Sequence, residues 1–83
     1  MWEIEYSDEV KFYFLDNYPY TFELLIKIEE LRFTEQALPA EGYKLTDAGY
    51  CWWEILDHIV IYRVTPGINR IRIFAVKPID EER

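Results

Sequence analysis

Three arginines and two aromatic residues in the second half of the chain are the side chains best suited to chemistry. They fall in β-like segments, together with one carboxylate: Trp52, Glu54, Arg63, Arg70, Arg72 and Phe74. Guanidinium groups bind phosphates in a bidentate manner, and aromatic rings stack on nucleic-acid bases. The same residue types anchor protein–protein interfaces. The pattern predicts a surface that binds nucleic acid or protein, or else a solvated strand face whose arginines pair with the carboxylate.

The segment from Gly49 to Val76 has to position these side chains. It is rich in β-branched and aromatic residues, and it is interrupted weakly at residues 56–58 and strongly at residues 65–67, where proline and glycine favour a turn. It therefore predicts an antiparallel meander of three strands, near residues 50–56, 58–65 and 68–77.

Alternation along these strands sorts the side chains into two faces. One face is almost wholly apolar and should form the core: Cys51, Trp53, Ile55, His58, Val60, Tyr62, Val64, Ile71, Ile73 and Ala75. The other face carries the arginines, the exposed aromatics and two isoleucines, Ile59 and Ile61, and should be open. In this register Arg63 lies opposite Arg70, an unfavourable like-charge pair that Glu54 or an anionic partner would relieve.

The first half of the chain predicts one strand and two helices. Residues 2–6 alternate apolar and acidic residues, which is typical of a strand. Ser7 is a suitable N-cap for a helix from Asp8 to Asp16, with Val10, Tyr13 and Phe14 inward. A second helix should begin at Tyr20 or Thr21 and end at Arg32 or Phe33, and the two should form an antiparallel hairpin. We expect its core face to contain Phe22, Leu25, Ile28 or Ile26, and Leu31.

The expected fold class is therefore α+β, as one domain over residues 1–83. A strand, two helices and a three-stranded antiparallel meander follow in order, with the helical hairpin packed on one face of a four-stranded sheet. Residues 43–45 lie in the polar connection after the second helix and should add a short strand or a turn. Residues 79–83 are expected to form a disordered tail.

Composition limits the function classes. The net charge is −7, and it is concentrated in residues 1–43, which hold 3 Lys/Arg against 10 Asp/Glu (3 − 10 = −7). Such acidity argues against non-specific nucleic-acid binding and favours a basic protein partner. One cysteine allows no internal disulfide or cysteine-rich zinc site, and no apolar stretch reaches the roughly 20 residues of a membrane span. We expect a cytoplasmic protein without cofactor, metal or membrane partner.

Cysteine–histidine catalysis is excluded by the predicted strands. A tight turn at residues 56–57 would place His58 beside Ile55, roughly 13 Å from Cys51 at about 3.3 Å per residue. Nucleophile and base need hydrogen-bond reach. Cys51 is therefore interpreted as an inert core thiol, and His58 as a structural residue or a general base.

Four segments carry a resemblance to the RelE/ParE toxin superfamily: residues 2–7, 50–56, 57–64 and 71–76. The third, DHIVIYRV, is similar to the GDYRVIYRV-like strand of that family. The resemblance implies a toxin that pairs with a basic-to-neutral antitoxin and either cuts mRNA on the ribosome or poisons DNA gyrase. In cutting members, basic residues on the open face stabilise the transition-state phosphate.

Carried onto this sequence, the resemblance implies catalytic roles for five residues: His58, Arg63, Arg70, Arg72 and Lys77. Trp52, Glu54 and Phe74 are the candidate binding residues. The arginine of the family's central strand is replaced here by Ile59, and the basic cluster after the last strand is reduced to residues 77–80. The alternatives are thus a weak ribosome-dependent endonuclease, a catalytically degenerate domain that binds a protein partner, and a gyrase inhibitor.

Overall fold

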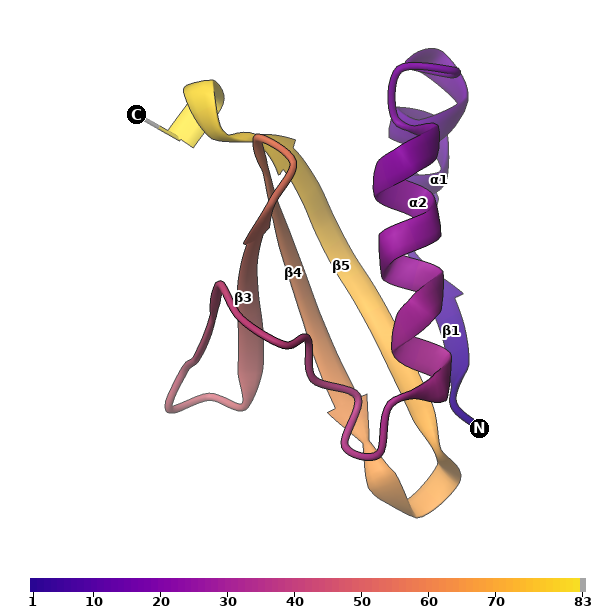
Figure 1. Cartoon of the computed structure of the whole chain (residues 1–83), viewed down its shortest axis with the longest axis vertical. Helices are drawn as coiled ribbons and strands as arrows, with labels where there is room; N and C mark the ends of the chain where they lie inside the picture. Colours follow the sequence, from indigo (N-terminus) through magenta and orange to yellow (C-terminus); the bar gives the residue numbers. More distant parts are fainter. Residues whose placement is uncertain (83) are drawn as a thin grey trace.

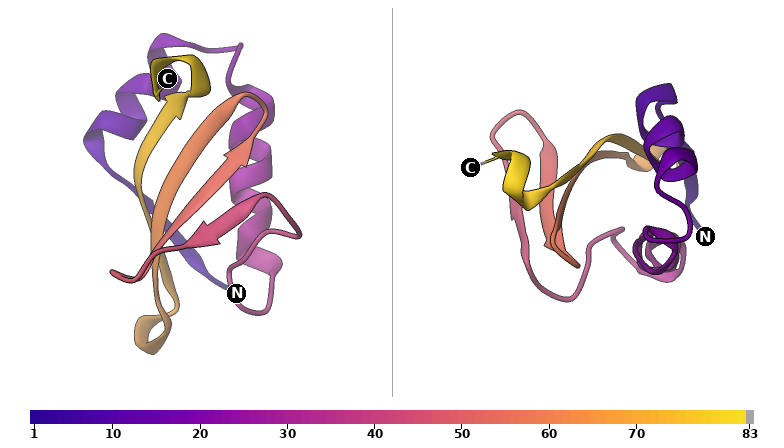
Figure 2. Two further views of the ribbon diagram at one scale, coloured as in Figure 1. Left: turned by 90° about the vertical axis from the view of Figure 1, so that its left-hand side faces the viewer. Right: turned by 90° about the horizontal axis from the view of Figure 1, so that it is seen from above.

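The fold places two helices against one face of a five-stranded mixed sheet (Figures 1 and 2). A computed structural model describes the backbone of residues 1–82 and the side chains of residues 1–80. The elements, in chain order, are β1 (Glu3–Tyr6), α1 (Asp8–Asp16), α2 (Phe22–Glu29), η1 (Glu30–Phe33), β2 (Tyr43–Leu45), β3 (Tyr50–Ile55), β4 (His58–Thr65), η2 (Pro66–Ile68), β5 (Arg70–Pro78) and η3 (Ile79–Glu82), where η denotes a 3-10 helix.

The sheet has the strand order β1-β5-β4-β3-β2. The antiparallel meander β3-β4-β5 confirms the three predicted strands, with β5 beginning at Arg70 instead of residue 68. β1 pairs in parallel with the start of β5, and β2 adds an antiparallel edge to β3. The prediction of four strands was therefore one short, because the three residues of β2 carried too weak a pattern to decide between strand and turn.

Helix α1 forms as its sequence predicts. The Ser7 side chain accepts a hydrogen bond from the backbone N–H of Val10 at 3.3 Å, which caps the first turn. Val10 is buried, and Tyr13 and Phe14 pack against the core beside it. The inward face predicted for this helix is confirmed.

The predicted core face of the second helix was partly wrong. Leu24, Ile28 and Leu31 are buried, whereas Phe22 is 50% exposed. Because Phe22, Leu25 and Ile26 extend the apolar side well beyond the buried residues, the periodicity does not determine which part of it faces the sheet. The helical path also changes at Glu30, where α2 gives way to the tighter η1.

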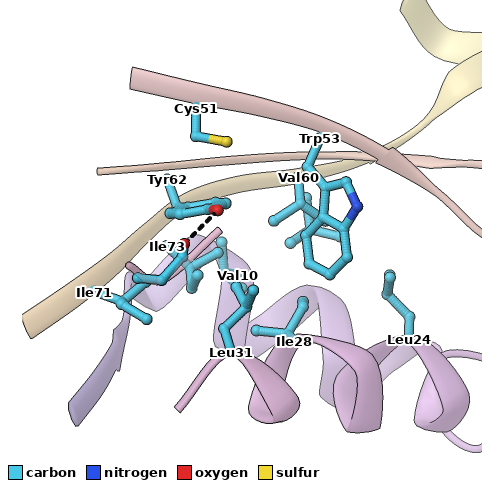
Figure 3. Close-up of a cluster of buried hydrophobic side chains, with 12 residues drawn as sticks. Val10, Leu24, Ile28, Leu31, Cys51, Trp53, Val60, Tyr62, Ile71 and Ile73 are labelled. Carbon is cyan, nitrogen blue, oxygen red and sulfur yellow. Dashed lines mark hydrogen bonds between the residues drawn. The ribbon is translucent and has the colours of Figure 1, made fainter. Parts of the chain in front are cut away.

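The core lies between the helices and the inner face of the sheet (Figure 3). Val10, Leu24 and Ile28 meet Trp53 and Tyr62, together with the strand residues Val60, Ile71 and Ile73. The Tyr62 hydroxyl, although fully buried, donates a hydrogen bond to the Ala37 carbonyl at 2.8 Å. The loop after η1 is thereby tied to the sheet, and the polar tip of the ring is satisfied.

A β-bulge in β5 shifts the predicted register. Ile61 pairs with Ala75 and Tyr62 pairs with Ile73, which leaves Phe74 as the extra residue. Val76 consequently faces the core at 6% exposure, and Ala75 does not, so the prediction for Ala75 was wrong.

The pairing of arginines between β4 and β5 also differs from the prediction. Residues 66–69 form the connection, so Thr65 pairs with Arg70 and Arg63 pairs with Arg72. The predicted Arg63–Arg70 pair was wrong because the connection is two residues longer than a tight hairpin.

The tail continues as η3 beyond Pro78, with the Ile79 N–H bonded to the Asp57 carbonyl at 2.9 Å. Arg83 lies outside the described residues.

The hairpin between β3 and β4 offers a stabilising substitution. Leu56 and Asp57 both adopt positive φ, 49° and 61°, as a type I′ turn requires. A side chain in this region costs about 1–2 kcal/mol, and asparagine and glycine tolerate it best. We expect Leu56→Asn combined with Asp57→Gly to raise the free energy of unfolding by about 1–2 kcal/mol in urea denaturation. Leu56→Ala, which keeps the unfavourable backbone, is the control, and an equal gain there would contradict the account.

Candidate functional site

The sheet surface turned away from the helices, here called the open face, is organised in rows by the strand register. One row contains Glu5, Arg72, Arg63 and Tyr50, and the next row toward η2 contains Glu3, Arg70 and Thr65. Beyond the bulge at Phe74 lie the rows Ala75, Ile61, Trp52, Lys44 and then Lys77, Ile59, Glu54. The open face thus has a charged end near η2 and an apolar middle.

The charged end gathers the three predicted arginines. Arg70 contacts Glu3 at 3.7 Å and Glu5 at 3.6 Å, and Arg72 also pairs with Glu5. The guanidinium of Arg63 lies over the Tyr50 ring, 5.6 Å from its centroid. The three arginines are close together, but two of them already have carboxylate partners on β1. These pairs are half-exposed, so each contributes at most about 1 kcal/mol and is open to exchange.

The like-charge pair of Arg63 and Arg72 is relieved differently from the sequence-based expectation. Glu5 pairs with Arg72 from the neighbouring strand. Glu54 lies opposite Ile59, four residues along β4 from Arg63, which is about 13 Å at 3.3 Å per residue. The expectation that Glu54 neutralises Arg63 is therefore wrong, because the register places the two at different ends of the open face.

Aromatic side chains form the middle of the open face. The Phe74 and Tyr50 rings meet edge to face with centroids 5.3 Å apart, and the guanidinium of Arg72 lies 5.3 Å from the Phe74 centroid. Trp52 is 41% exposed in the adjacent row. Phe74 reaches Tyr50 because the bulge changes the direction of its side chain. We call Tyr50, Trp52 and Phe74 the aromatic strip.

A hollow of about 410 Å³ lies next to the aromatic strip. Ile59 is 8% exposed there, and Trp52, Glu54 and Lys44 are among the other lining residues. The hollow has an apolar residue at the position where the resemblance would place an arginine. It is suited to an apolar side chain flanked by polar groups, and Ile59 itself offers no charge to a phosphate.

His58 is separated from the arginines by the sheet. It is 3% exposed on the helical face, where its Nε2 lies 2.7 Å from the Tyr13 hydroxyl and the Tyr20 ring packs nearby. Its Nδ1 lies 2.8 Å from the Leu56 carbonyl, so Nδ1 carries a hydrogen and donates it. The imidazole is held between a helix and a turn, as expected of a structural histidine.

Lys77 is also distant from the charged end. Lys77 lies opposite Ile59, whereas Arg72 lies opposite Arg63, which is four residues further along β4. The five candidate catalytic residues thus separate into three places: Arg63, Arg70 and Arg72 together, Lys77 at the other end of the sheet, and His58 on the helical face.

Reasoning from the sequence missed the carboxylates of this site. Glu3 and Glu5 enter it because β1 lies parallel to β5, with Glu3 opposite Arg70 and Glu5 opposite Arg72. Their alternation with Trp2, Ile4 and Tyr6 was visible, and it placed both carboxylates on one strand face. The alternation did not indicate which strand β1 pairs with, because that pairing is set by tertiary structure, so the arginine partners of Glu3 and Glu5 could not be predicted.

Other chemistry finds little support among the described residues. Burial raises the pKa of the Cys51 thiol and so disfavours the reactive thiolate. Among the side chains of residues 1–80, no group of three His, Cys, Asp or Glu is arranged to hold a metal ion. None of the helices described is long and apolar enough to cross a membrane.

No model of a known protein family matches this sequence, and no curated protein shows significant similarity to it.

Proposed function

We propose that this chain is a catalytically degenerate, RelE/ParE-like domain that binds a protein partner through its open face. The observation that carries the proposal is the composition of that face: aromatic rings and arginines lie together, and the carboxylates beside them, Glu3 and Glu5, are already paired with two of those arginines. Aromatic and arginine side chains supply most of the binding energy at protein interfaces. The resemblance to the toxin superfamily supports an antitoxin-like chain as the partner.

Phosphodiester cleavage needs more than cations. A proton-transfer group must lie within hydrogen-bond reach of the reacting oxygens, and charge stabilisation must converge on the same phosphate. Arg63, Arg70 and Arg72 supply charge, but His58 lies behind the sheet and Lys77 at its far end. Ile59, which lies opposite Lys77, neutralises no charge, and Glu3 and Glu5 are held in ion pairs with Arg70 and Arg72.

The open face suits a partner with two features. The hollow at Ile59, beside Trp52, accepts an apolar side chain. Arg63 is exposed and has the Tyr50 ring as its neighbour, so it is available to a carboxylate of the partner. Arg70 and Arg72 can exchange Glu3 and Glu5 for the same carboxylate at little cost, because exposed ion pairs are weak.

A second candidate function, ribosome-dependent mRNA cleavage, is favoured by one observation. Three arginines gather beside Tyr50 and Phe74, whose rings meet edge to face, and arginines combined with aromatic rings are typical of surfaces that bind single-stranded RNA. On this reading the arginines contact the scissile phosphate after Glu3 and Glu5 release them.

Expressing the chain alone in a bacterial host separates the two functions. The proposed function predicts normal growth and normal incorporation of labelled amino acids into protein. It also predicts no difference between the original chain and a variant with Arg70→Ala and Arg72→Ala. Arrest of translation that the double substitution abolishes would establish the nuclease. Arrest with DNA damage and intact translation would instead establish gyrase poisoning.

Site-specific photocrosslinking tests partner binding directly. A benzoylphenylalanine introduced at Trp52 should form one discrete protein adduct in the native host, and Arg63→Glu should abolish it. The same probe at Glu35, an exposed residue in the loop after η1, is the matched control and should form none. An adduct to ribosomal RNA, or equal adducts at both positions, would contradict the proposal.

A further inference from the structure

The helices expose apolar side chains on the surface that faces away from the sheet. The outer helical surface, as defined here, contains Phe12 (63% exposed), Leu15 (73%), Tyr18 (68%), Phe22 (50%) and Ile26 (45%). The two helices that carry it lie on one side of the sheet (Figures 1 and 2), and at its margin Phe12 lines a hollow beside β5 together with Ala75 and Lys77. A helix on the surface of a small domain normally presents charged and polar residues on its outer side.

The spacing of these residues makes them neighbours within each helix. Phe12 and Leu15 are three residues apart on α1, and Phe22 and Ile26 are four apart on α2, so each pair shares one helix face. The Tyr18 and Phe22 rings contact edge to face with centroids 6.1 Å apart. These positions oppose the buried sides of the helices, which contribute Val10, Leu24 and Ile28 to the core. Both helices are thus apolar on two sides.

Acidic side chains surround this apolar surface. From Asp8 to Arg32 the chain holds three Lys/Arg and six Asp/Glu, a net charge of 3 − 6 = −3, and Glu29 is bonded to Arg32 and Tyr6. The two lysines are already paired, Lys11 with Asp8 at 4.0 Å and Lys27 with Glu30 at 3.5 Å. Glu9, Asp16 and Glu23 are exposed beside the apolar residues.

We propose that the outer helical surface docks a cationic amphipathic helix of another protein, with apolar residues on one side and Lys or Arg on its flanks. Such a helix buries its apolar side against the phenylalanines and matches the acidic rim. A second copy of this chain would place acid against acid, and the anionic headgroups of a membrane would be repelled likewise. The surface is distinct from the open face, so this inference does not depend on the proposed function.

Fluorescence anisotropy with a synthetic peptide tests the inference on the full chain. The probe is a fluorescein-labelled 18-residue amphipathic helix of leucine and lysine, and the reference probe carries glutamate in place of lysine. We expect binding of the lysine peptide alone, weakening as salt increases. Phe22→Ser with Ile26→Ser should raise its Kd at least tenfold with all charges unchanged. Glu23→Gln with Glu30→Gln should raise it several-fold and flatten the salt dependence.

Leu45→Ser is the matched control, because Leu45 is 59% exposed on β2, away from this surface, and its replacement should leave the Kd unchanged. Circular dichroism of each variant confirms that it remains folded. Equal binding by the serine double variant, or equal binding of the glutamate peptide, would overturn the inference. Self-association in sedimentation equilibrium that the same double variant abolishes, or binding to anionic vesicles with the lysine peptide unbound, would overturn it as well.

Discussion

Replacing Val76 with asparagine should lower the free energy of unfolding by about 2–4 kcal/mol, whereas Ala75→Asn should lower it by less than about 1 kcal/mol. Val76 is 6% exposed and pairs with Val60, so an amide there loses apolar contacts and is removed from water. Ala75 lies on the other side of the strand, opposite Ile61. The two substitutions introduce the same side chain at adjacent positions of one strand, and only burial differs.

Urea denaturation followed by circular dichroism measures both values. Asparagine is used instead of aspartate because Glu9 and Asp16 line the surface near Ala75, where a new carboxylate would add repulsion. The comparison reports directly on the bulge at Phe74. Without the bulge the order would reverse, so a larger loss for Ala75→Asn would refute the register.

Alkaline pH should destabilise the fold steeply through two tyrosines. Burial raises the pKa of Tyr62, and burial together with the Glu29 carboxylate raises the pKa of Tyr6. Their phenols ionise near pH 10 in the unfolded chain but remain protonated in the folded protein. Above about pH 10 the unfolded state therefore binds fewer protons, and each tyrosine should lower the free energy of unfolding by about 1.4 kcal/mol per pH unit.

The stabilising effect of these groups is complete below pH 10 and is lost as the pH rises toward the folded-state values. Burial also raises the pKa of the Cys51 thiol, so its ionisation destabilises the folded protein in the same way. The effect of Cys51 begins at lower pH, because a thiol in the unfolded chain ionises near pH 8.5. A series of urea denaturations from pH 8 to 11 measures the slope. Tyr62→Phe should remove one tyrosine's share of the slope and cost about 1 kcal/mol at neutral pH, since the Ala37 carbonyl loses its donor. An unchanged slope in that variant would contradict the assignment.

The elements with strong local signals were predictable from the sequence. Period-two alternation identified β3, β4 and β5, because each has one side in the core. Ser7 followed by two acidic residues identified the start of α1. In these segments the local pattern and the final burial agree, so no tertiary information was needed.

The remaining features depend on contacts between distant segments. The bulge at Phe74 has no glycine or other local marker, and it moves the core position from Ala75 to Val76. The parallel pairing of β1 with β5 brings Glu3 and Glu5 to the arginines across 65 residues or more of chain. The orientation of α2 is undetermined locally because Phe22 and Leu24 are both apolar, and only packing selects Leu24.

The candidate site was predictable to the same extent as the strands that carry it. Trp52, Arg63, Arg70, Arg72 and Phe74 share the open face, as alternation indicates. Which arginines pair across β4 and β5 was not predictable, since it follows from the length of the β4–β5 connection. Glu54, placed by the β3–β4 register, and Lys77, near the end of β5, lie at the end opposite the arginines, and the catalytic set implied by the resemblance is dispersed.

The most direct test of the central claim is primer-extension mapping of mRNA ends after purified chain is incubated with ribosomes translating a defined message. The account predicts no new ends, and identical profiles for the original chain and for the variant with Arg70→Ala and Arg72→Ala. New ends within the ribosomal A site that the double substitution removes would show that the open face cleaves RNA, and would contradict the account.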